Sequence, residues 1–407
     1  MITRYEFKNF CSFEELSILE LLAPSNKVKN RFPDNFVKTE YGLDILKTAV
    51  IVGENAGGKT NVIKSLNFLK KLFQTNNIVK SFKNLININN ICSDKIKDCN
   101  TEQSFYLEVL LDKSLYIYSL KIDHIGIVEE KLSVKKTCNS KIKEILLAKR
   151  NILDDSNDKV AHLNYKLSLN ISEEKYEPIA NALEANELGL YINKLALVGN
   201  PSCSKFVDFI INDLYADEIL YSYNILKDYK KDEDDQKIIK ELRFLDILKM
   251  VDPSIIGLEI NEEHPFMKSL IKRKKQNGDV FSMELDKDSS GVIKFFSLAV
   301  QIYRVVYENK IIFADEMDKV LNPILSDKII SFINAKSHKG QFIITTHNAL
   351  HLDLKKYMKE QIYFATKNPD TLSSELYSLA DFLQVRYETT KIHEFYMKGI
   401  LGGITNA

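Results

Sequence analysis

The sequence lacks the cysteine pairs and the charge imbalance that mark several classes of protein. Its five cysteines are scattered and include no CxxC pair, which argues against a disulfide framework and against a zinc site. Lys and Arg together number 56, as do Asp and Glu. The balance excludes an overall basic field that would draw the chain to DNA or to an anionic membrane.

Targeting and membrane-spanning patterns are also missing. The first residues alternate between polar and apolar side chains and do not form a signal peptide. No window approaches the roughly 18 uninterrupted apolar residues that a membrane helix needs. We therefore expect a cytoplasmic protein with no membrane partner. At 407 residues and 45% hydrophobic composition, the chain can form two or three structural units around a sizeable core.

The strongest motif is a glycine-rich loop between a predicted strand and a predicted helix. Residues 48–52 are almost entirely apolar, as in a parallel strand covered on both faces, and residues 53–60 (GENAGGKT) match the pattern GxxxxGK[ST]. In such a loop the backbone N–H groups surround phosphate oxygens. Lys59 would reach the β- and γ-phosphates and Thr60 would bind Mg²⁺. An ordinary glycine-rich turn is the alternative. The residues expected to bind the nucleotide here are Gly53, Asn55, Gly58, Lys59, Thr60 and Asn61.

Two later strands carry polar residues at their ends. Residues 310–314 (KIIFA) precede Asp315 and Glu316, and residues 342–346 (FIITT) precede His347. Open α/β sheets bind ligands at the carboxyl ends of their strands. We therefore expect Asp315 to hold Mg²⁺ and Glu316 to orient and deprotonate a water molecule. A solvated strand end and a structural histidine are the plain alternatives.

Residues 288–291 (DSSG) open a predicted amphipathic helix whose apolar positions extend to Val306. A Ser-Ser-Gly turn is ordinarily a helix N-cap. The same turn offers a hydroxyl, free backbone N–H groups and the positive end of a helix dipole to an anion. The residues alone leave both roles open.

In this order the four signals resemble the head of an ABC-type ATPase. GENAGGKT comes first, DSSG follows it, and IIFADE and then TTH come after DSSG. Within that class the chain resembles the overcoming-lysogenization-defect-like branch, which is related to SMC and RecF heads and is often called AAA-type core. The element at residues 5–13 (YEFKNFCSF) is also similar to the opening of that branch. The resemblance covers residues 1–75 and 280–407.

The resemblance implies an α/β fold with a P-loop mixed sheet, an antiparallel β subdomain and a helical insertion. It assigns catalytic roles to Lys59, Glu316 and His347, the last as a switch histidine at the γ-phosphate. Ser289 and Gly291 would cap the γ-phosphate of ATP bound to a second protomer. ATP and Mg²⁺ are the implied ligands. The implied assembly is a homodimer, or a higher homo-oligomer, formed through an ATP sandwich.

The chain departs from the family pattern in two places. Residues 319–320 (Lys-Val) stand where small or polar residues are common in the D-loop, and Asn322 replaces a frequent histidine. These changes bear on the contact across the dimer interface. The Q-loop glutamine is not evident, since Gln103 comes early, and Glu129 and Glu130 are the alternatives.

These motifs divide the chain into three expected units. Residues 1–135 form an N-lobe with the Walker A loop and an antiparallel hairpin. Residues 136–255 form a mostly helical insertion for dimerisation or partner docking. Residues 256–407 form a C-lobe with the signature, the Walker B acids and the switch histidine.

Two charged runs have alternative interpretations. Residues 227–240 read as a solvated face or loop rather than a metal site. Residues 272–275 (KRKK) precede Asn277-Gly278, a strong hairpin signal. The four cations either grip a nucleic-acid backbone or protect an exposed strand edge from aggregation.

The expected function is ATP hydrolysis that senses infection and regulates a separate effector. Nuclease members of the branch carry a Toprim-type domain after the ATPase, and the segment that follows His347 is too short for one. We therefore expect the effector, a nuclease or toxin, to be another protein in a bacterial anti-phage system of the abortive-infection or PARIS-like kind. A RecF- or SMC-like DNA-repair ATPase, with DNA as its partner, is the alternative. A catalytically inactive, ATP-dependent scaffold also remains open.

Overall fold

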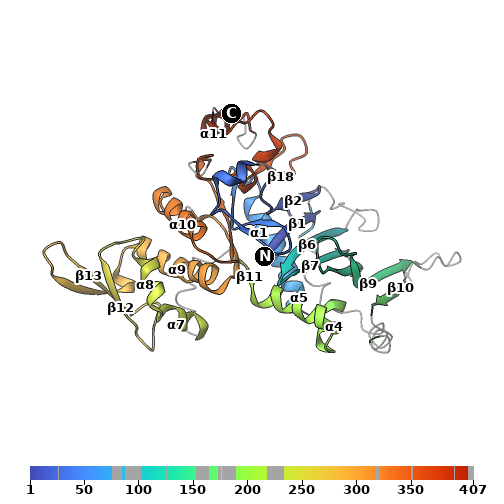
Figure 1. Ribbon diagram of the computed structural model, residues 1–407, viewed down its shortest axis with the longest axis horizontal. Coiled ribbons are helices and arrows are strands. Elements are labelled where there is room, and N and C mark those ends of the chain that lie inside the picture. Colours follow the sequence, from blue (N-terminus) through green and yellow to red (C-terminus); the bar gives the residue numbers. More distant parts are fainter. Residues whose placement is uncertain are drawn as a thin grey trace.

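The structure is a computed structural model of the whole chain, and Figure 1 shows its elements in space. It describes residues 1–25, 27–75, 85–87, 102–123, 126–152, 165–172, 176, 189–217, 233–317, 321–349, 352–388 and 390–401. Within these residues no helix is long and apolar enough to cross a membrane.

A mixed sheet lies at the centre of the molecule and carries the motifs. In spatial order its described strands are β11 (Leu214–Asp217), β15 (Ile311–Ala314), β16 (Gln341–Thr346), β5 (Thr48–Val52), β17 (Ile362–Lys367) and β18 (Ser374–Ser378). Every neighbouring pair is parallel except β17 and β18. The predicted strands before the P-loop, before Asp315 and before His347 are confirmed as β5, β15 and β16, and they lie together in this sheet.

Apolar residues on both faces of this sheet are buried in two different cores. In β5, Ala49 and Ile51 belong to one core, whereas Val50 and Val52 belong to the other. Successive side chains of a strand point to opposite faces, so an unbroken apolar run is what a doubly covered strand requires. The helices that pack on the sheet are α1 (Lys59–Gln74) on the first face, and α9 (Ser290–Glu308) and α10 (Pro323–Ala335) on the second.

An antiparallel sheet packs on the first face through α1 (Figure 1). In spatial order its described strands are β10 (Tyr165–Ile171), β9 (Lys143–Ile152), β8 (Ile127–Lys135), β7 (Ser114–Ile122), β6 (Gln103–Leu111), β1 (Ile2–Lys8) and β2 (Ser17–Glu20). The half-buried first strand and the hairpin around residues 112–113 were both predicted, and both are present.

A three-stranded antiparallel sheet forms the far end of the molecule, at the left of Figure 1. It consists of β12 (Ile255–Glu259), β13 (Leu270–Lys274) and β14 (Val280–Glu284), and the turn at Asn277-Gly278 joins the last two, as predicted. Elsewhere the structure has the short strand pair β3 (Phe36–Lys38) and β4 (Asp44–Leu46), and the helix α11 (Ile392–Met397) near the end of the described chain.

The stretch 136–255 is not as uniformly helical as its sequence suggests. The helices α4 (Tyr191–Leu197), α5 (Pro201–Asn212), α7 (Glu233–Ile239) and α8 (Leu242–Leu248) lie in it. However, β9 and β10 extend the antiparallel sheet, and β11 becomes the edge strand of the mixed sheet beside β15. The periodicity missed β11 because its pairing partner, β15, lies elsewhere in the sequence. The boundaries of the three expected units remain a prediction.

One acid of the charged run 227–240 is not solvated, contrary to prediction. Residues 227–232 lie outside the described part of the chain, but Asp235 on α7 is fully buried. Its carboxylate lies 2.5 Å from the guanidinium of Arg304 on α9, which is also buried. A charge inside a protein requires such a partner because burial removes its hydration.

A second buried carboxylate joins the antiparallel sheet to the helices below it. Glu130 on β8 is fully buried and accepts hydrogen bonds from the backbone N–H groups of Tyr191 and Ile192, at 2.7 and 3.2 Å, in the first turn of α4. The hydroxyl of Tyr118 donates to it at 3.0 Å. Burial raises the pKa of Glu130 to about 7, although these three hydrogen bonds favour the ionised form.

We predict that Glu130 makes the protein less stable as pH rises. Because its pKa is higher in the folded chain than in the unfolded chain, its stabilising contribution is complete below about pH 4.5 and is lost as pH rises through about 7. The loss is on the order of 3 kcal/mol, since each pKa unit corresponds to about 1.4 kcal/mol. Urea unfolding of the wild type and E130Q at pH 5 and pH 8 measures it.

E130Q should show a smaller difference in stability between the two pH values than the wild type. E129Q, which changes the neighbouring residue on the opposite face of the same strand, is the matched control. An identical pH dependence in E130Q and the wild type would contradict the assignment.

Candidate nucleotide-binding site

The P-loop joins β5 to α1 at the carboxyl edge of the mixed sheet. Helix α1 begins at Lys59 and is capped by Gly58, whose φ of 107° is a left-handed conformation that favours glycine. The Lys59 side chain is buried and turns back over the loop. Its Nζ donates to the carbonyl oxygens of Gly53 at 2.8 Å and Glu54 at 2.7 Å. The ammonium group therefore lies inside the loop that would surround phosphates.

The glycines of the loop are required by the strand next to it. A Cβ on Gly53 would lie 2.1 Å from the backbone oxygen of Ala365 on β17, and a Cβ on Gly57 would lie 2.4 Å from the same atom. Neither distance is compatible with a real carbon atom. The loop thus rests directly on the backbone of β17, and Asn55 is exposed above it.

Asp315, the predicted Walker B acid, meets the P-loop through a chain of hydroxyl contacts. Thr60 Oγ1 donates to Asp315 Oδ2 at 2.8 Å, and Thr345 Oγ1 donates to Asp315 Oδ1 at 2.5 Å. The N–H of Glu316 donates to Thr345 Oγ1 at 2.8 Å. Asp315 and Thr345 are buried. Three strand ends, from β5, β15 and β16, are joined in this way.

Glu316 and His347 lie next to this chain of contacts and are partly exposed. The Nδ1 of His347 is 3.2 Å from Lys59 Nζ, and its Nε2 is 3.9 Å from Glu316 Oε1. Glu316 has a φ of 47°, a left-handed backbone conformation that is unusual for a glutamate. Such conformations concentrate at functional sites. The structure therefore brings together Lys59, Thr60, Asp315, Glu316 and His347.

The side chain of Asn61 contacts the N-terminal element of the chain. Its amide donates to Ser12 Oγ at 2.8 Å, and Ser374 Oγ donates to the same oxygen at 2.7 Å. Ser12 belongs to the N-terminal element that resembles the opening of the family. Within these contacts, Asn61 anchors the P-loop helix to the N-terminus and to β18.

The predicted signature residues are exposed at the N-terminus of α9. Ser289 is the N-cap, and its Oγ accepts from the N–H of Val292 at 3.3 Å. A Cβ on Gly291 would meet only Ser289 Oγ, at 3.9 Å. The N-cap interpretation is confirmed, and the same exposed turn is open to another molecule. The contacts that join Lys59, Asp315 and His347 do not include these residues.

The three Q-loop candidates, Gln103, Glu129 and Glu130, all lie on strands of the antiparallel sheet. Gln103 is buried and donates to the carbonyl oxygens of Asn9 and Leu85. Glu130 caps α4, and Glu129 lies on the other face of β8. Residues 319–320 of the D-loop lie outside the described residues, whereas Asn322 is the N-cap of α10.

Thr345 is the site residue that motif reasoning missed. The motifs assign roles to His347 at the end of TTH and to the two acids at the end of IIFADE, but none to Thr345, the first residue of TTH. The signal lay in adjacency, because β15 and β16 pair in parallel with Ala314 opposite Ile344. That register puts the next residues, Asp315 and Thr345, side by side.

Comparison with known protein families identifies the domain that the chain contains. A family model described as "AAA domain, putative AbiEii toxin, Type IV TA system" matches residues 49–353, about three quarters of the chain. The chain belongs to this AAA family. The matched range runs from β5, through the P-loop and the Walker B acids, to just beyond His347. A search of curated proteins found no match.

Solved structures with a similar course of the chain include SMC heads. They include the SMC head domain from Thermotoga maritima (14% identity, TM-score 0.44), an SMC head bound to the C-terminal winged-helix domain of ScpA (13%, 0.44) and an SMC head with an extended coiled coil bound to the C-terminal domain of ScpA derived from Pyrococcus furiosus (12%, 0.41). Each alignment covers 93% of this chain and 98%, 97% and 96% of theirs, respectively. The predicted fold class, an α/β fold with a P-loop mixed sheet and an antiparallel β subdomain, is confirmed by the arrangement of the strands themselves.

We predict that the AAA domain does not tolerate a side chain at Gly53. In G53A the added carbon must push the P-loop away from Ala365, whose backbone cannot give way. Overpacking of this kind costs about 1–3 kcal/mol. Thermal unfolding should therefore show a Tm several degrees lower.

G257A is the matched control, because a Cβ there would meet only the Lys272 side chain at an ordinary 3.7 Å. Equal Tm values for G53A and the wild type would show that the loop does not rest on β17 in solution.

Proposed function

We propose that this AAA domain binds and hydrolyses ATP as an ATP-dependent dimer that regulates a separate effector in bacterial phage defence. The observation that carries the proposal is the meeting of Lys59, Thr60 and Asp315 at the carboxyl edge of the mixed sheet, with Glu316 and His347 beside them. Phosphoryl transfer depends mainly on positioning and charge stabilisation, and this group contains side chains for both tasks.

The P-loop residues would hold the phosphates of ATP. Lys59 Nζ now donates to two neutral carbonyl groups, and phosphate oxygens are stronger, charged acceptors for the same donors. The N-terminus of α1 adds backbone N–H groups and the positive end of its dipole. Gly53 and Gly58 shape the loop around the phosphates, and Asn55 lies exposed beside it.

The same site fits a magnesium ion. Mg²⁺ prefers hard oxygen ligands and is usually held by one or two protein oxygens together with substrate phosphates and water. Thr60 Oγ1 and Asp315 Oδ2 are such a pair and already lie 2.8 Å apart. When bound with ATP, the ion would neutralise charge on the β- and γ-phosphates.

Glu316 is the proposed general base. Its partly exposed carboxylate would accept a proton from a water molecule aligned with the γ-phosphate. His347 would contact the γ-phosphate from the side of Lys59, consistent with the 3.2 Å contact between their nitrogens. Ser289 and Gly291 would meet the γ-phosphate of ATP bound to a second protomer, because their turn is exposed. ATP would then lie between two subunits, and hydrolysis would release them.

We predict that E316Q binds ATP but loses most turnover. Loss of a general base typically lowers a rate by about 10²–10⁴-fold. K59A should instead weaken ATP binding by at least about tenfold, since it removes the charged donor from the phosphate position. Phosphate release and equilibrium titration with a fluorescent ATP analogue separate the two effects. E388Q, a change at an exposed carboxylate, is the control.

Unchanged turnover in E316Q would exclude its role as base. Absence of turnover in the wild type, with ATP bound, would favour a catalytically inactive scaffold.

The regulatory role is supported by the family and by the sequence resemblance. The family description names a toxin and a type IV toxin–antitoxin system. The resemblance is to ATPase components of anti-phage systems in which a nuclease or toxin is another protein. The basic run 272–275 supports the DNA-repair alternative weakly, because Lys272 is paired with Glu259 and Arg273 is buried.

We predict that tagged E316Q, purified with ATP and Mg²⁺ from cells that express its native operon, retains a stoichiometric second protein. Mass spectrometry identifies that protein and light scattering gives the size of the assembly. The wild type, which completes hydrolysis, should release the partner and is the control. Recovery of a bare dimer that retains DNA, with affinity falling steeply as salt rises, would favour the repair alternative instead.

A further inference from the structure

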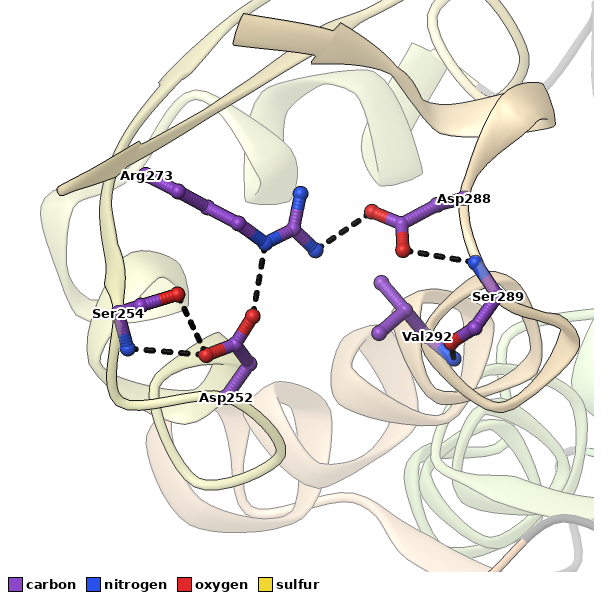
Figure 2. Close-up of polar contacts among 6 residues, drawn as sticks. All are labelled: Asp252, Ser254, Arg273, Asp288, Ser289 and Val292. Carbon is purple, nitrogen blue, oxygen red and sulfur yellow. Dashed lines mark hydrogen bonds and ion pairs between the residues drawn. The ribbon is translucent and has the colours of Figure 1, made fainter. Parts of the chain in front are cut away.

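Arg273 on β13 is buried in a place where the sequence predicts an exposed basic run. Its Nε donates to Asp252 Oδ2 at 2.7 Å, and its Nη2 donates to Asp288 Oδ2 at 2.5 Å. Figure 2 shows the guanidinium between the two carboxylates, with Asp288 on the side of α9. The side chain of Arg273 is 7% exposed and that of Asp288 is 5% exposed, so little solvent screens this pair.

The contact continues from Asp288 into the signature turn, which we define as residues 288–291. The second carboxylate oxygen of Asp288 accepts from the N–H of Ser289 at 2.7 Å. Ser289 Oγ in turn accepts from the N–H of Val292 in the first turn of α9. A continuous line of hydrogen bonds therefore runs from β13 to the exposed serine (Figure 2).

The other end of the line is fixed in the three-stranded sheet and its neighbouring turn. Asp252 follows α8, and its Oδ1 accepts from both the N–H and the hydroxyl of Ser254, at 2.9 and 2.6 Å. Although burial opposes it, these bonds and the one from Arg273 hold the pKa of Asp252 below its usual value. Asp252 thus stays ionised and holds one side of the guanidinium.

An arginine makes this link with a fixed geometry. The guanidinium holds its donors in a rigid, planar fork that points toward the two separate acids, whereas the three donors of a lysine ammonium rotate freely at the end of a flexible chain and do not fix the direction of either acid. Residues 289–291 of the signature turn are exposed, so their place depends on contacts of this kind from the chain beneath them. A displacement on the order of 1 Å at a reacting group can cost about 10²-fold in rate.

We infer that Arg273 is a positioning residue, which holds Asp288 and thereby sets the place of Ser289 and of the N-terminus of α9. The inference rests on the proposed function for its effect on catalysis, because Ser289 is proposed to act on ATP bound to the partner protomer. The three-stranded sheet thus gains a role as the support of the signature turn.

The test compares R273K with R304K. Arg304 is the matched control because it lies on α9, the helix that Arg273 is inferred to position. Arg304 also makes a buried ion pair, with Asp235, and it lies in the last third of α9 rather than at its start. Both variants keep the charge and lose the fork. Three quantities are measured in each variant. They are the hydrogen exchange rate of the amides of residues 289–292, the kcat for ATP hydrolysis and the affinity for ATP.

In R273K the amides of residues 289–292 should exchange at least about fivefold faster, because local opening of the helix start becomes easier. The kcat should fall at least about tenfold, and ATP affinity of the P-loop should stay within about twofold. R304K should leave both the exchange at 289–292 and the kcat near wild-type values. A merely structural Arg273 would lower kcat and ATP affinity together, in proportion to the loss of Tm, in both variants.

A double-mutant cycle with D288N gives a second criterion. If Arg273 acts through Asp288, R273K should cost little further activity in the D288N background, so the two effects are not additive. Additive losses would overturn the inference, as would unchanged exchange at 289–292 in R273K. Absence of turnover in the wild type would refute the proposed function and the catalytic effect, while the exchange rates would still decide whether Arg273 holds the turn.

Discussion

The hydrogen bond between Thr60 and Asp315 is the contact on which the site depends. Its two residues follow β5 and β15, which are not neighbours, because β16 lies between them. Adjacent strands are about 4.8 Å apart, so the two strand ends must be bridged over roughly twice that distance. The bridge exists because the P-loop turns back over the sheet and Thr345 fills the middle position. A parallel sheet buried on both faces supplies the rigidity that this alignment requires.

Local features of the site could be predicted from the sequence, and contacts between distant segments could not. Gly53 to Thr60, the acids after β15 and the turn at Ser289 each have a pattern contained within a few residues. The role of Thr345 required knowledge of which strands are neighbours. The strand β11 escaped prediction for the same reason, since its partner β15 comes much later in the chain.

Charge patterns were the least reliable guide to position. Arg273 and Asp235 both lie in charged runs that the sequence predicts to be exposed, yet both are buried in ion pairs. A sequence shows the charge but not its partner, and each partner lies on or beside a different element of the chain. Buried pairs of this kind add little net stability, because desolvation offsets their attraction, but they are costly to break on one side. Their effect is to fix geometry, and both act on α9.

The backbone of Glu316 shows how geometry and chemistry are joined in this site. Its left-handed conformation is unfavourable for a residue with a side chain, so other contacts must maintain it. The hydrogen bond from the Glu316 N–H to Thr345 Oγ1 is one such contact. Thr345 also donates to Asp315, so a single buried hydroxyl holds the carboxylate of Asp315 and the backbone of Glu316. The proposed base and the proposed metal ligand are therefore not independent, because the same threonine of β16 contacts both residues.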